Sequence, residues 1–322
     1  ERKSTDLPET NFWWEHDWEV DGLDWSSSRV DSNLSAHTPA VRALLLYPTN
    51  ALVEDQISRL RRAAIRALEK HGVPLFYFGR YTSGTPGGLY FPPNVLKSKD
   101  RTQISQLARN IREIVREHEA LSDRPLEERI QFSDPYCGEM LTRWDMIASP
   151  PDILITNVSM LNVMLLRENE APIFDKTKHW LNSHPDNKFS IIVDELHTYR
   201  GSQGSEVALT LRNLFERLGI SPDSDKLRCL GTSASLDGEE GKKYLEEFFS
   251  VHRDSFSVFS GNPHIPESQL PLSLEEIKQA KSPDQLSFSP RNALGAALAS
   301  VGRATDGRMV PAKLSKVSEC LF

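Results

Sequence analysis

Short apolar runs alternate with helical patterns along residues 42–249, and this alternation limits the possible folds more than any other feature of the chain. The apolar runs are Arg42–Tyr47, Pro74–Phe78, Asp152–Thr156, Phe189–Asp194 and Leu227–Gly231. Between them, apolar residues recur every three or four positions, as amphipathic helices require, over 51–70, 102–120, 159–168, 203–218 and 239–249. Strands that alternate with helices predict an α/β fold with a parallel, doubly wound sheet.

The flanking segments differ from this core in composition. Residues 1–38 are acidic and polar but include Trp13, Trp14, Trp18 and Trp25 without a sustained period, so we expect an irregular arm or insertion. We expect these tryptophans to pack on their own domain. The main domain is expected at 39–260, with an insertion at about 80–150 and a last strand at Ser255–Phe259. Residues 261–322 are expected to be a linker and the start of a helical region, with helices near 290–301 and 312–321.

Charge and cysteine content exclude several classes of protein. The 38 Lys and Arg residues against 45 Asp and Glu give a net charge of −7, so any DNA contact must come from a local basic patch. No apolar run approaches the ~18 residues of a membrane span, and we expect a cytoplasmic protein without a membrane partner. The widely spaced Cys137, Cys229 and Cys320 favour neither a disulfide framework nor a zinc cluster.

The segment Ser190–His197 is the strongest candidate for chemistry, because an apolar run leads directly into Asp194 and Glu195. In a parallel sheet, ligands bind at the carboxyl ends of the strands. Adjacent carboxylates on an extended backbone point to opposite sides, so one can hold Mg²⁺ through water while the other accepts a proton from an attacking water. Taken alone, the two residues are better explained as a pair of solvated loop acids.

Other segments, in the right order, make the sequence resemble the superfamily 2 DEAD/DEAH-box helicases. Asp194-Glu195-Leu196-His197 resembles the Walker B box in its DExH form. Tyr47–Leu52 is similar to motif Ia, and Asp152–Asn157 with Ser159–Leu161 to motif Ib. Gly231–Ser235 resembles the Ser-Ala-Thr motif III, with Ser235 in place of the usual Thr. The resemblance covers residues 41–260 and implies a RecA-like (P-loop NTPase) sheet.

Three further stretches point to one subgroup of these helicases. They are Asp194–Gly201 with Gly204-Ser205 after it, Asn50–Gln56, and Arg143–Met146 before Pro150-Pro151-Asp152. They are similar to the large bacterial helicases of the mitomycin-repair and phage-defence type. This resemblance implies a role in DNA repair or antiphage defence, possible defence-system subunits as partners, and DNA as the substrate, either single-stranded or with a single-stranded end.

The resemblance also implies roles for individual residues, with ATP and Mg²⁺ as cofactors. Asp194 would position Mg²⁺ through water, and Glu195 would orient and deprotonate the attacking water. Three residues, His197, Thr232 and Ser233, would couple hydrolysis to domain closure. A metal site made of His197, Asp194 and Glu195 is a disfavoured alternative, because three such closely spaced loop residues rarely converge on one metal.

The nucleic-acid contacts would lie on the other motifs. Pro48, Thr49 and Asn50 begin a helix whose free N–H groups favour a phosphate, and Thr156 and Asn157 do the same at the next turn. The alternative is ordinary helix capping, in which Asn50 is the N-cap. Arg80 and Thr82 lie in a Gly-containing stretch, expected to be a loop over 79–93, that contacts phosphate or is a plain turn. The basic run Arg59, Arg61, Arg62 and Arg66 is expected to be a solvated face, or otherwise a DNA-facing edge.

One expected feature is missing from these residues. A phosphate-cradling loop needs glycines around a Lys and a Ser or Thr, and Gly238–Lys243 has the wrong spacing and lacks the hydroxyl. With the start at Glu1, this predicts a fragment of a helicase motor. Remaining parts of the same helicase would then supply the second RecA-like domain and the Walker A strand, expected beside the Walker B strand. The alternatives are a degenerate helicase-like module that binds nucleic acid or a partner protein, and, less favoured, a stand-alone nuclease or metal hydrolase.

Overall fold

The computed structural model describes residues 12–16, 18, 25, 27–29, 38–87, 98–234, 236 and 238–259. The chain divides into two compact units, Glu1–Val258 and Phe259–Phe322. Everything beyond Phe259 lies outside the described residues, and so do the linker and the two helices expected there. None of the helices among the described residues has the length and apolar character needed to cross a membrane.

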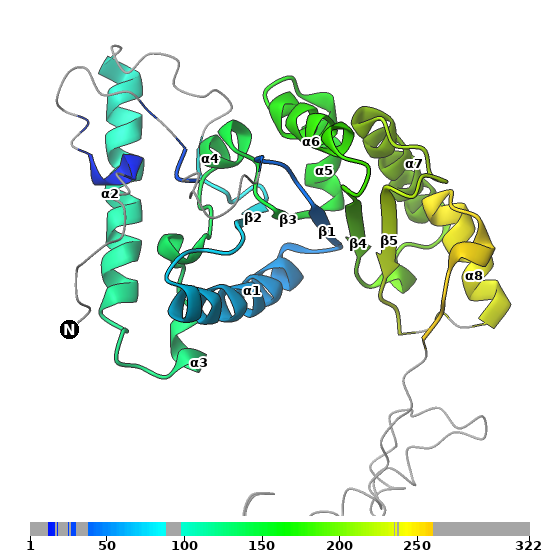
Figure 1. The fold of residues 1–322 in the computed structure, drawn as a ribbon, viewed down its shortest axis with the longest axis horizontal. Coiled ribbons are helices and arrows are strands. Elements are labelled where there is room, and N and C mark those ends of the chain that lie inside the picture. Colours follow the sequence, from blue (N-terminus) through cyan, green and yellow to red (C-terminus); the bar gives the residue numbers. More distant parts are fainter. Residues whose placement is uncertain are drawn as a thin grey trace, which may run out of the picture. The chain divides into compact units, whose positions relative to one another are not determined.

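The core of the first unit is a five-stranded sheet in which every pair of neighbours is parallel (Figure 1). Its strands lie in the order β2-β3-β1-β4-β5. They are β1 (Ala43–Tyr47), β2 (Phe78–Tyr81), β3 (Ile153–Asn157), β4 (Phe189–Val193) and β5 (Leu227–Gly231). The predicted α/β class with a parallel, RecA-like sheet is confirmed.

Helices cover both faces of this sheet, as the doubly wound prediction requires. Leu44 and Leu46 of β1 pack with residues of α5, α6 and α7, whereas Leu45 packs on the other face with α1 (Figure 1). The alternation follows from the period of two in a strand. The α-helices are α1 (Asn50–His71), α2 (Ser98–Glu119), α3 (Leu126–Arg129), α4 (Arg143–Ala148), α5 (Val158–Leu166), α6 (Ala171–Ser183), α7 (Gly201–Leu218) and α8 (Gly238–Phe249). The 3₁₀ helices are η1 (Trp13–Glu15), η2 (Pro135–Cys137), η3 (Leu196–Thr198) and η4 (Arg253–Ser255).

The second strand begins later than predicted: β2 starts at Phe78, so the strand expected at Pro74–Phe78 and the loop expected from residue 79 are wrong. The cause is packing from a distant segment. A Cβ on Gly79 would lie 2.6 Å from the sulfur of Met146 and 2.9 Å from the carbonyl oxygen of Met140. Only glycine lets the backbone approach this closely, so a residue typical of loops lies within the strand.

The last predicted strand, at Ser255–Phe259, is also wrong. Its first residue ends η4, no strand follows, and the Phe259 side chain is 91% exposed. A strand needs a neighbour to satisfy its backbone N–H and C=O groups. Within the described residues, nothing pairs with this segment.

The expected position of the Walker A strand is wrong as well. No position beside the Walker B strand is free for it, because β4 pairs with β1 on one side and with β5 on the other. The described part of the sheet instead has an open edge at β5. Several residues of β5 are exposed to solvent, and Leu230 is 50% exposed. Any further strand on this side of the sheet has to add to β5.

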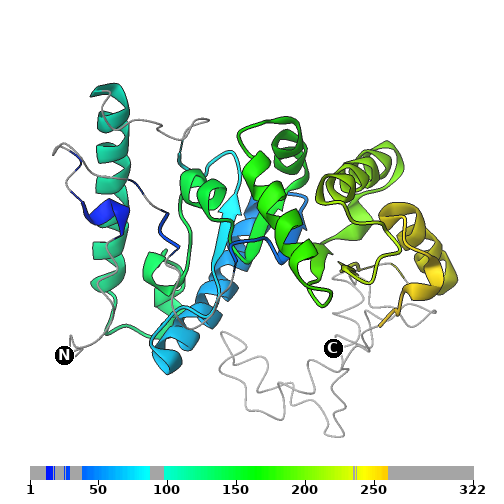
Figure 2. The same ribbon diagram turned by 45° about the horizontal axis from the view of Figure 1, so that its top comes forward.

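The tryptophan-rich arm packs on its own domain, as expected. Trp13, Trp14 and Trp18 are 1–2% exposed and pack against one face of α2 (Figure 2). The α2 residues on that face are Ile104, Leu107, Ala108, Ile111 and Val115. Trp144 of α4 completes the cluster, so the arm ties the helix of the predicted insertion to the main domain.

A buried carboxylate fixes the arm in place. Asp145 of α4 is 1% exposed and accepts hydrogen bonds from the indole N–H of Trp13 (3.0 Å), the backbone N–H of Ser28 (2.8 Å) and the hydroxyl of Thr142 (2.7 Å). Burial raises the pKa of Asp145 above its usual 3.8, and the hydrogen bonds oppose this rise. Desolvation of the charged form therefore outweighs its hydrogen bonds.

This raised pKa predicts how the stability of the protein depends on pH. The native state binds the Asp145 proton more tightly than the unfolded state, so its contribution to stability is complete below pH 3.8 and is lost as pH rises through the native pKa. We expect the thermal midpoint of Asp145→Asn, relative to wild type, to be lowest near pH 4 and to recover toward pH 7. A difference that stays constant between pH 4 and pH 7 would contradict this assignment.

Candidate functional site

The residues of the helicase-like motifs meet at one edge of the sheet, because parallel strands end on the same side. Asp194 follows β4 and Thr232 follows β5; Pro48 follows β1, Asn157 ends β3 and Thr82 follows β2. With the strand order β2-β3-β1-β4-β5, the acidic pair and Thr232 occupy one half of the edge. The residues expected to bind nucleic acid occupy the other half.

Thr232 joins the end of β5 to the turn after β4. Its hydroxyl donates to Oδ1 of Asp194, and its N–H donates to the carbonyl of Val193 (3.0 Å). The N–H of Leu196 donates to the Thr232 carbonyl (2.9 Å). These contacts extend the β4–β5 ladder, in which Val193 is level with Gly231, beyond the last strand residue. Asp194 is therefore held in one orientation by the motif III segment.

Glu195 has a backbone conformation that is rare for its residue type. Its φ of 53° and ψ of 44° lie in the left-handed region, where a residue with a Cβ costs about 1–2 kcal/mol. This conformation turns the chain from β4 into η3. The Glu195 side chain is 40% exposed, so its carboxylate is accessible to a water or a ligand.

His197 lies beside Glu195 on the same turn. Its Nδ1 is 3.1 Å from Oε2 of Glu195 but has no partner in hydrogen-bonding geometry among the described residues. The two groups therefore form a close pair whose charge depends on the protonation of the imidazole. Ser233 follows Thr232 and is half-buried, and Ser235, the variant position of motif III, lies outside the described residues.

Two tyrosines near this cluster stay neutral. Burial, followed by the negative charge of Asp194, raises the pKa of Tyr47 to about 12. The same two causes, in the same order, raise the pKa of Tyr199. Both phenols keep their protons at pH 7, so neither adds charge to that of the carboxylates.

The site fits a magnesium ion held partly by other ligands better than a metal cage. No group of three His, Cys, Asp or Glu side chains among the described residues is arranged to hold a metal, so the disfavoured His197, Asp194 and Glu195 site is not formed there. Mg²⁺ is usually bound by one or two carboxylates together with waters and substrate phosphates. The half-buried Asp194, with one oxygen fixed by Thr232, suits this mode of binding.

Two asparagines connect the motif Ia and motif Ib turns. The side-chain N–H of Asn157 donates to Oδ1 of Asn50 (2.6 Å), and Oδ1 of Asn157 accepts from the N–H of Met160 (2.7 Å). Asn157 is thus the N-cap of α5. The expectation that Asn50 caps α1 is wrong, because Asn50 is the first helical residue and the N-cap is Thr49, whose side chain makes no capping bond.

Three of the predicted nucleic-acid contacts are engaged within the protein. Thr156 is 0% exposed and donates its hydroxyl to the carbonyl of Tyr81 (2.7 Å), and Thr82 is also buried. Arg80 forms an ion pair with Glu54 of α1. Thr156 links the end of β3 to that of β2, and neither threonine side chain reaches the surface. The exposed Thr49 and Asn50, with the half-buried Pro48 and Asn157, are the members of the predicted set that face solvent at this edge.

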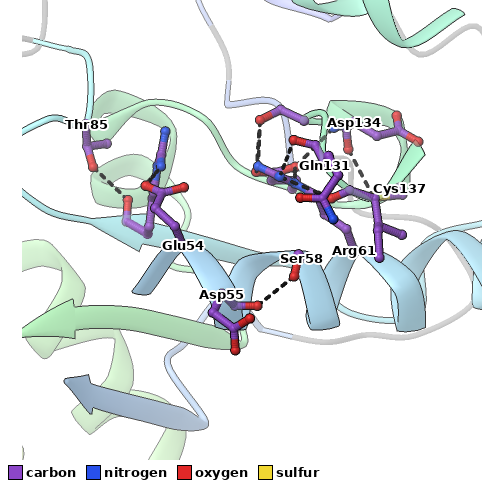
Figure 3. A network of polar contacts seen from close by, with 12 residues as sticks. Glu54, Asp55, Ser58, Arg61, Thr85, Gln131, Asp134 and Cys137 are labelled. Carbon is purple, nitrogen blue, oxygen red and sulfur yellow. Dashed lines mark hydrogen bonds and ion pairs between the residues drawn. The ribbon is translucent and has the colours of Figure 1, made fainter. Parts of the chain in front are cut away.

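The basic run of α1 is not a continuous solvated face, because Arg61 points inward. Its guanidinium makes two bonds to Glu139, from Nε (2.8 Å) and from Nη2 (2.7 Å). Figure 3 shows Arg61 directed from α1 toward the segment of Gln131, Asp134 and Cys137. Arg59 does lie on the solvated face that the sequence predicts, where it is exposed and pairs with Asp55. The alternative of a DNA-facing edge is wrong for Arg61.

A hollow of about 800 Å³ between α7 and α8 was not predicted from the sequence. It combines apolar residues, such as Leu209 and Phe248, with charged ones, such as Arg212 and Glu240. The hollow arises from the way α7 and α8, which lie on either side of β5 in the chain, pack together, so only the folded structure could reveal it.

Comparison with known proteins gives a related sequence and similar solved structures. The chain is 32% identical over 290 residues to Druantia protein DruE of Escherichia coli (strain UMEA 4076-1). The match covers 75% of this chain and 15% of the length of that protein. The chain is thus a relative of DruE, and the resemblance derived from the motifs is confirmed.

Solved structures of the DUF1998 helicase MrfA are also similar to the chain. MrfA bound to DNA is 24% identical, with a TM-score of 0.35 over 66% of this chain and 20% of that one. MrfA bound to DNA and AMPPNP has the same identity, coverage and TM-score. No model of a protein family matches the chain.

Proposed function

We propose that this chain is part of the motor of an ATP-dependent DNA helicase or translocase, with a role in DNA repair or antiphage defence. One observation carries the proposal: Asp194, fixed by the Thr232 hydroxyl, and the accessible Glu195 occupy the carboxyl edge of a parallel sheet. The surface asparagines of the motif Ia and Ib turns lie on the same edge, one and two strands along from β4. An acidic pair next to a set of backbone-binding turns is what a nucleic-acid-stimulated nucleotide hydrolase requires.

The residues have separate roles in this proposal. Asp194 would hold Mg²⁺ through water, and the chemistry gained there would be positive charge next to the ATP phosphates. Glu195, whose side chain is 40% exposed, orients the attacking water and accepts its proton. His197, 3.1 Å from Glu195, and Thr232, bonded to Asp194, couple hydrolysis to domain closure together with Ser233. Thr49, Asn50 and Asn157 hold a DNA strand by its phosphates, independently of sequence.

Further polypeptide completes the motor. The chain spans 15% of the length of DruE, and the described residues contain no phosphate-cradling loop. We propose that the remaining part of the same helicase adds the Walker A strand at the open edge of β5 and contributes a second RecA-like domain. The exposed Leu230 and the unpaired outer side of β5 support this position.

The proposal is tested by measuring ATP turnover of the full-length protein with and without DNA. We expect DNA to stimulate turnover, and Thr232→Val to reduce it by about 10–100-fold, because orienting partners of metal-binding carboxylates have effects of this size. The matched control is Thr210→Val, which removes a hydroxyl bonded to the Glu206 carbonyl within α7. Absence of turnover under all conditions would favour the degenerate binding module instead.

A further inference from the structure

The turn that carries Glu195 and His197 is short and strained. It consists of Glu195, with its left-handed backbone, and the three residues of η3. A left-handed residue with a Cβ costs free energy and persists only where the surrounding structure holds it. A single 3₁₀ turn makes too few hydrogen bonds of its own to do this. Contacts from other elements must therefore fix the turn.

The motif III segment holds the beginning of this turn. The backbone N–H of Leu196 donates to the carbonyl of Thr232 at 2.9 Å. The Leu196 side chain packs directly on β5, because a Cβ on Gly231 would lie 2.1 Å from its Cδ1. Both contacts are made at the first residue of η3, so the end of the turn needs a different partner.

Tyr244 of α8, which the helicase-like motifs do not include, holds the end of the turn. Its hydroxyl donates to the carbonyl of Tyr199 and lies 3.2 Å from the carbonyl oxygen of Leu196. These two carbonyls belong to residues on either side of His197 in the chain. One side chain from a separate helix therefore spans the part of the turn that carries the imidazole.

The Tyr244 side chain and its acceptor are both fixed in place. The ring stacks on that of Phe248, with centroids 5.7 Å apart, and Phe248 is 2% exposed. Burial raises the pKa of Tyr244, against the opposing charge of Arg200, so the hydroxyl remains a hydrogen-bond donor at neutral pH. On the other side, a Cβ on Gly204 of α7 would lie 2.5 Å from the Tyr199 carbonyl oxygen, so only glycine lets α7 approach this carbonyl so closely.

We infer that Tyr244 is a positioning residue, which holds Glu195 and His197 in the arrangement that ATP hydrolysis requires. This inference rests on the proposed function, and it adds a residue outside the helicase-like motifs. Thr232 and Tyr244 hold the two ends of the turn from the same stretch of chain, which leads from β5 into α8. A misplacement of about 1 Å can slow catalysis by about 100-fold, so the loss of one such bond is enough to matter. Asp194 is held separately by Thr232, so ATP binding should not depend on Tyr244.

The test is steady-state ATP hydrolysis by the full-length Tyr244→Phe protein in the presence of DNA. Phenylalanine keeps the stacked ring and removes only the hydroxyl. We expect kcat to fall by about 10–100-fold while KM for ATP stays within about twofold of wild type, because the lost bond acts on the transition state and not on ATP binding. The control is Tyr136→Phe, which removes a hydroxyl bonded to Glu15 at 3.0 Å. It should hydrolyse ATP as wild type does.

Two further measurements separate positioning from general stability. The backbone N–H groups of η3 and Tyr199 should exchange with solvent faster in Tyr244→Phe, while those of α1 keep their wild-type rates. Gly204→Ala should also lower kcat, because its methyl group displaces the Tyr199 carbonyl from the side of α7. The control for that variant is Gly241→Ala, whose methyl group would meet nothing closer than 3.5 Å.

Each other outcome has a defined meaning. Unchanged hydrogen exchange in η3 would overturn the inference, since the hydroxyl would then not hold the turn. A lower thermal midpoint with wild-type kcat, measured where every variant is folded, would make the bond purely structural and overturn it as well. If wild type hydrolyses ATP and Tyr244→Phe does so equally well, this inference fails alone. If wild type hydrolyses no ATP with or without DNA, the proposed function fails, and the inference fails with it.

Discussion

Glu195→Gln is expected to lower the rate of DNA-stimulated ATP hydrolysis by about 10²–10⁴-fold, which is the usual contribution of a general base. Glutamine has the same shape as glutamate but cannot accept the proton of the attacking water. Asp194 and its bond from Thr232 remain, so ATP and Mg²⁺ should still bind. The measurement compares ATP turnover with the affinity for a fluorescent ATP analogue.

The control for this variant is Glu206→Gln, which makes the same chemical change on the exposed face of α7. Its turnover should equal that of wild type. A Glu195→Gln protein that retains turnover above about 10% would contradict the role of Glu195 as the base. Loss of both turnover and ATP affinity would instead indicate that the substitution disturbs the turn itself, which the left-handed backbone of Glu195 makes sensitive.

The strands that could be predicted from the sequence are those whose apolar residues are contiguous. The predicted ranges of β1, β3, β4 and β5 agree with the structure to within one residue at each end. Burial on both faces of a parallel sheet requires such runs, so the signal is local. The start of β2 could not be predicted, because Gly79 is required by Met140 and Met146, which lie more than 60 residues away. Whether Ser255–Phe259 forms a strand depends on a neighbouring strand, which the local sequence does not specify.

The candidate site, like the strands, could be predicted from the sequence only in part. That the acids and Thr232 would meet follows from the parallel order of the strands, since all carboxyl ends share one edge. Which polar side chains at that edge reach the solvent could not be predicted. Thr156 and Asn157 are neighbours in one motif, yet the first is fully buried under Tyr81 and the second is half-exposed. The direction of each side chain depends on β2 and on α5, which are separate elements of the fold.

Arg61→Met is expected to destabilise the protein by about 3–5 kcal/mol, because it leaves a buried carboxylate without its counter-charge. The side chains of Arg61 and Glu139 are 6% and 2% exposed. Arg61 also bonds the Ile130 and Gln131 carbonyls and the Ser133 hydroxyl, so its removal uncouples α1 from the segment that precedes β3. The measurement is the free energy of unfolding from urea titration, followed by tryptophan fluorescence.

The control is Arg62→Met, one residue along the same helix. Arg62 is 42% exposed and 3.9 Å from Glu127, and exposed pairs of this kind contribute at most about 1 kcal/mol. Arg61→Met/Glu139→Met should recover most of the lost stability, because replacing both charges removes the desolvation penalty that replacing one leaves behind. Equal effects of Arg61→Met and Arg62→Met would show that the Arg61–Glu139 pair does not hold α1 in place. A large effect confined to Arg61 would mean that a residue of the basic run, which its sequence assigns to the surface, instead fixes the helix that begins with Asn50 at the candidate DNA edge.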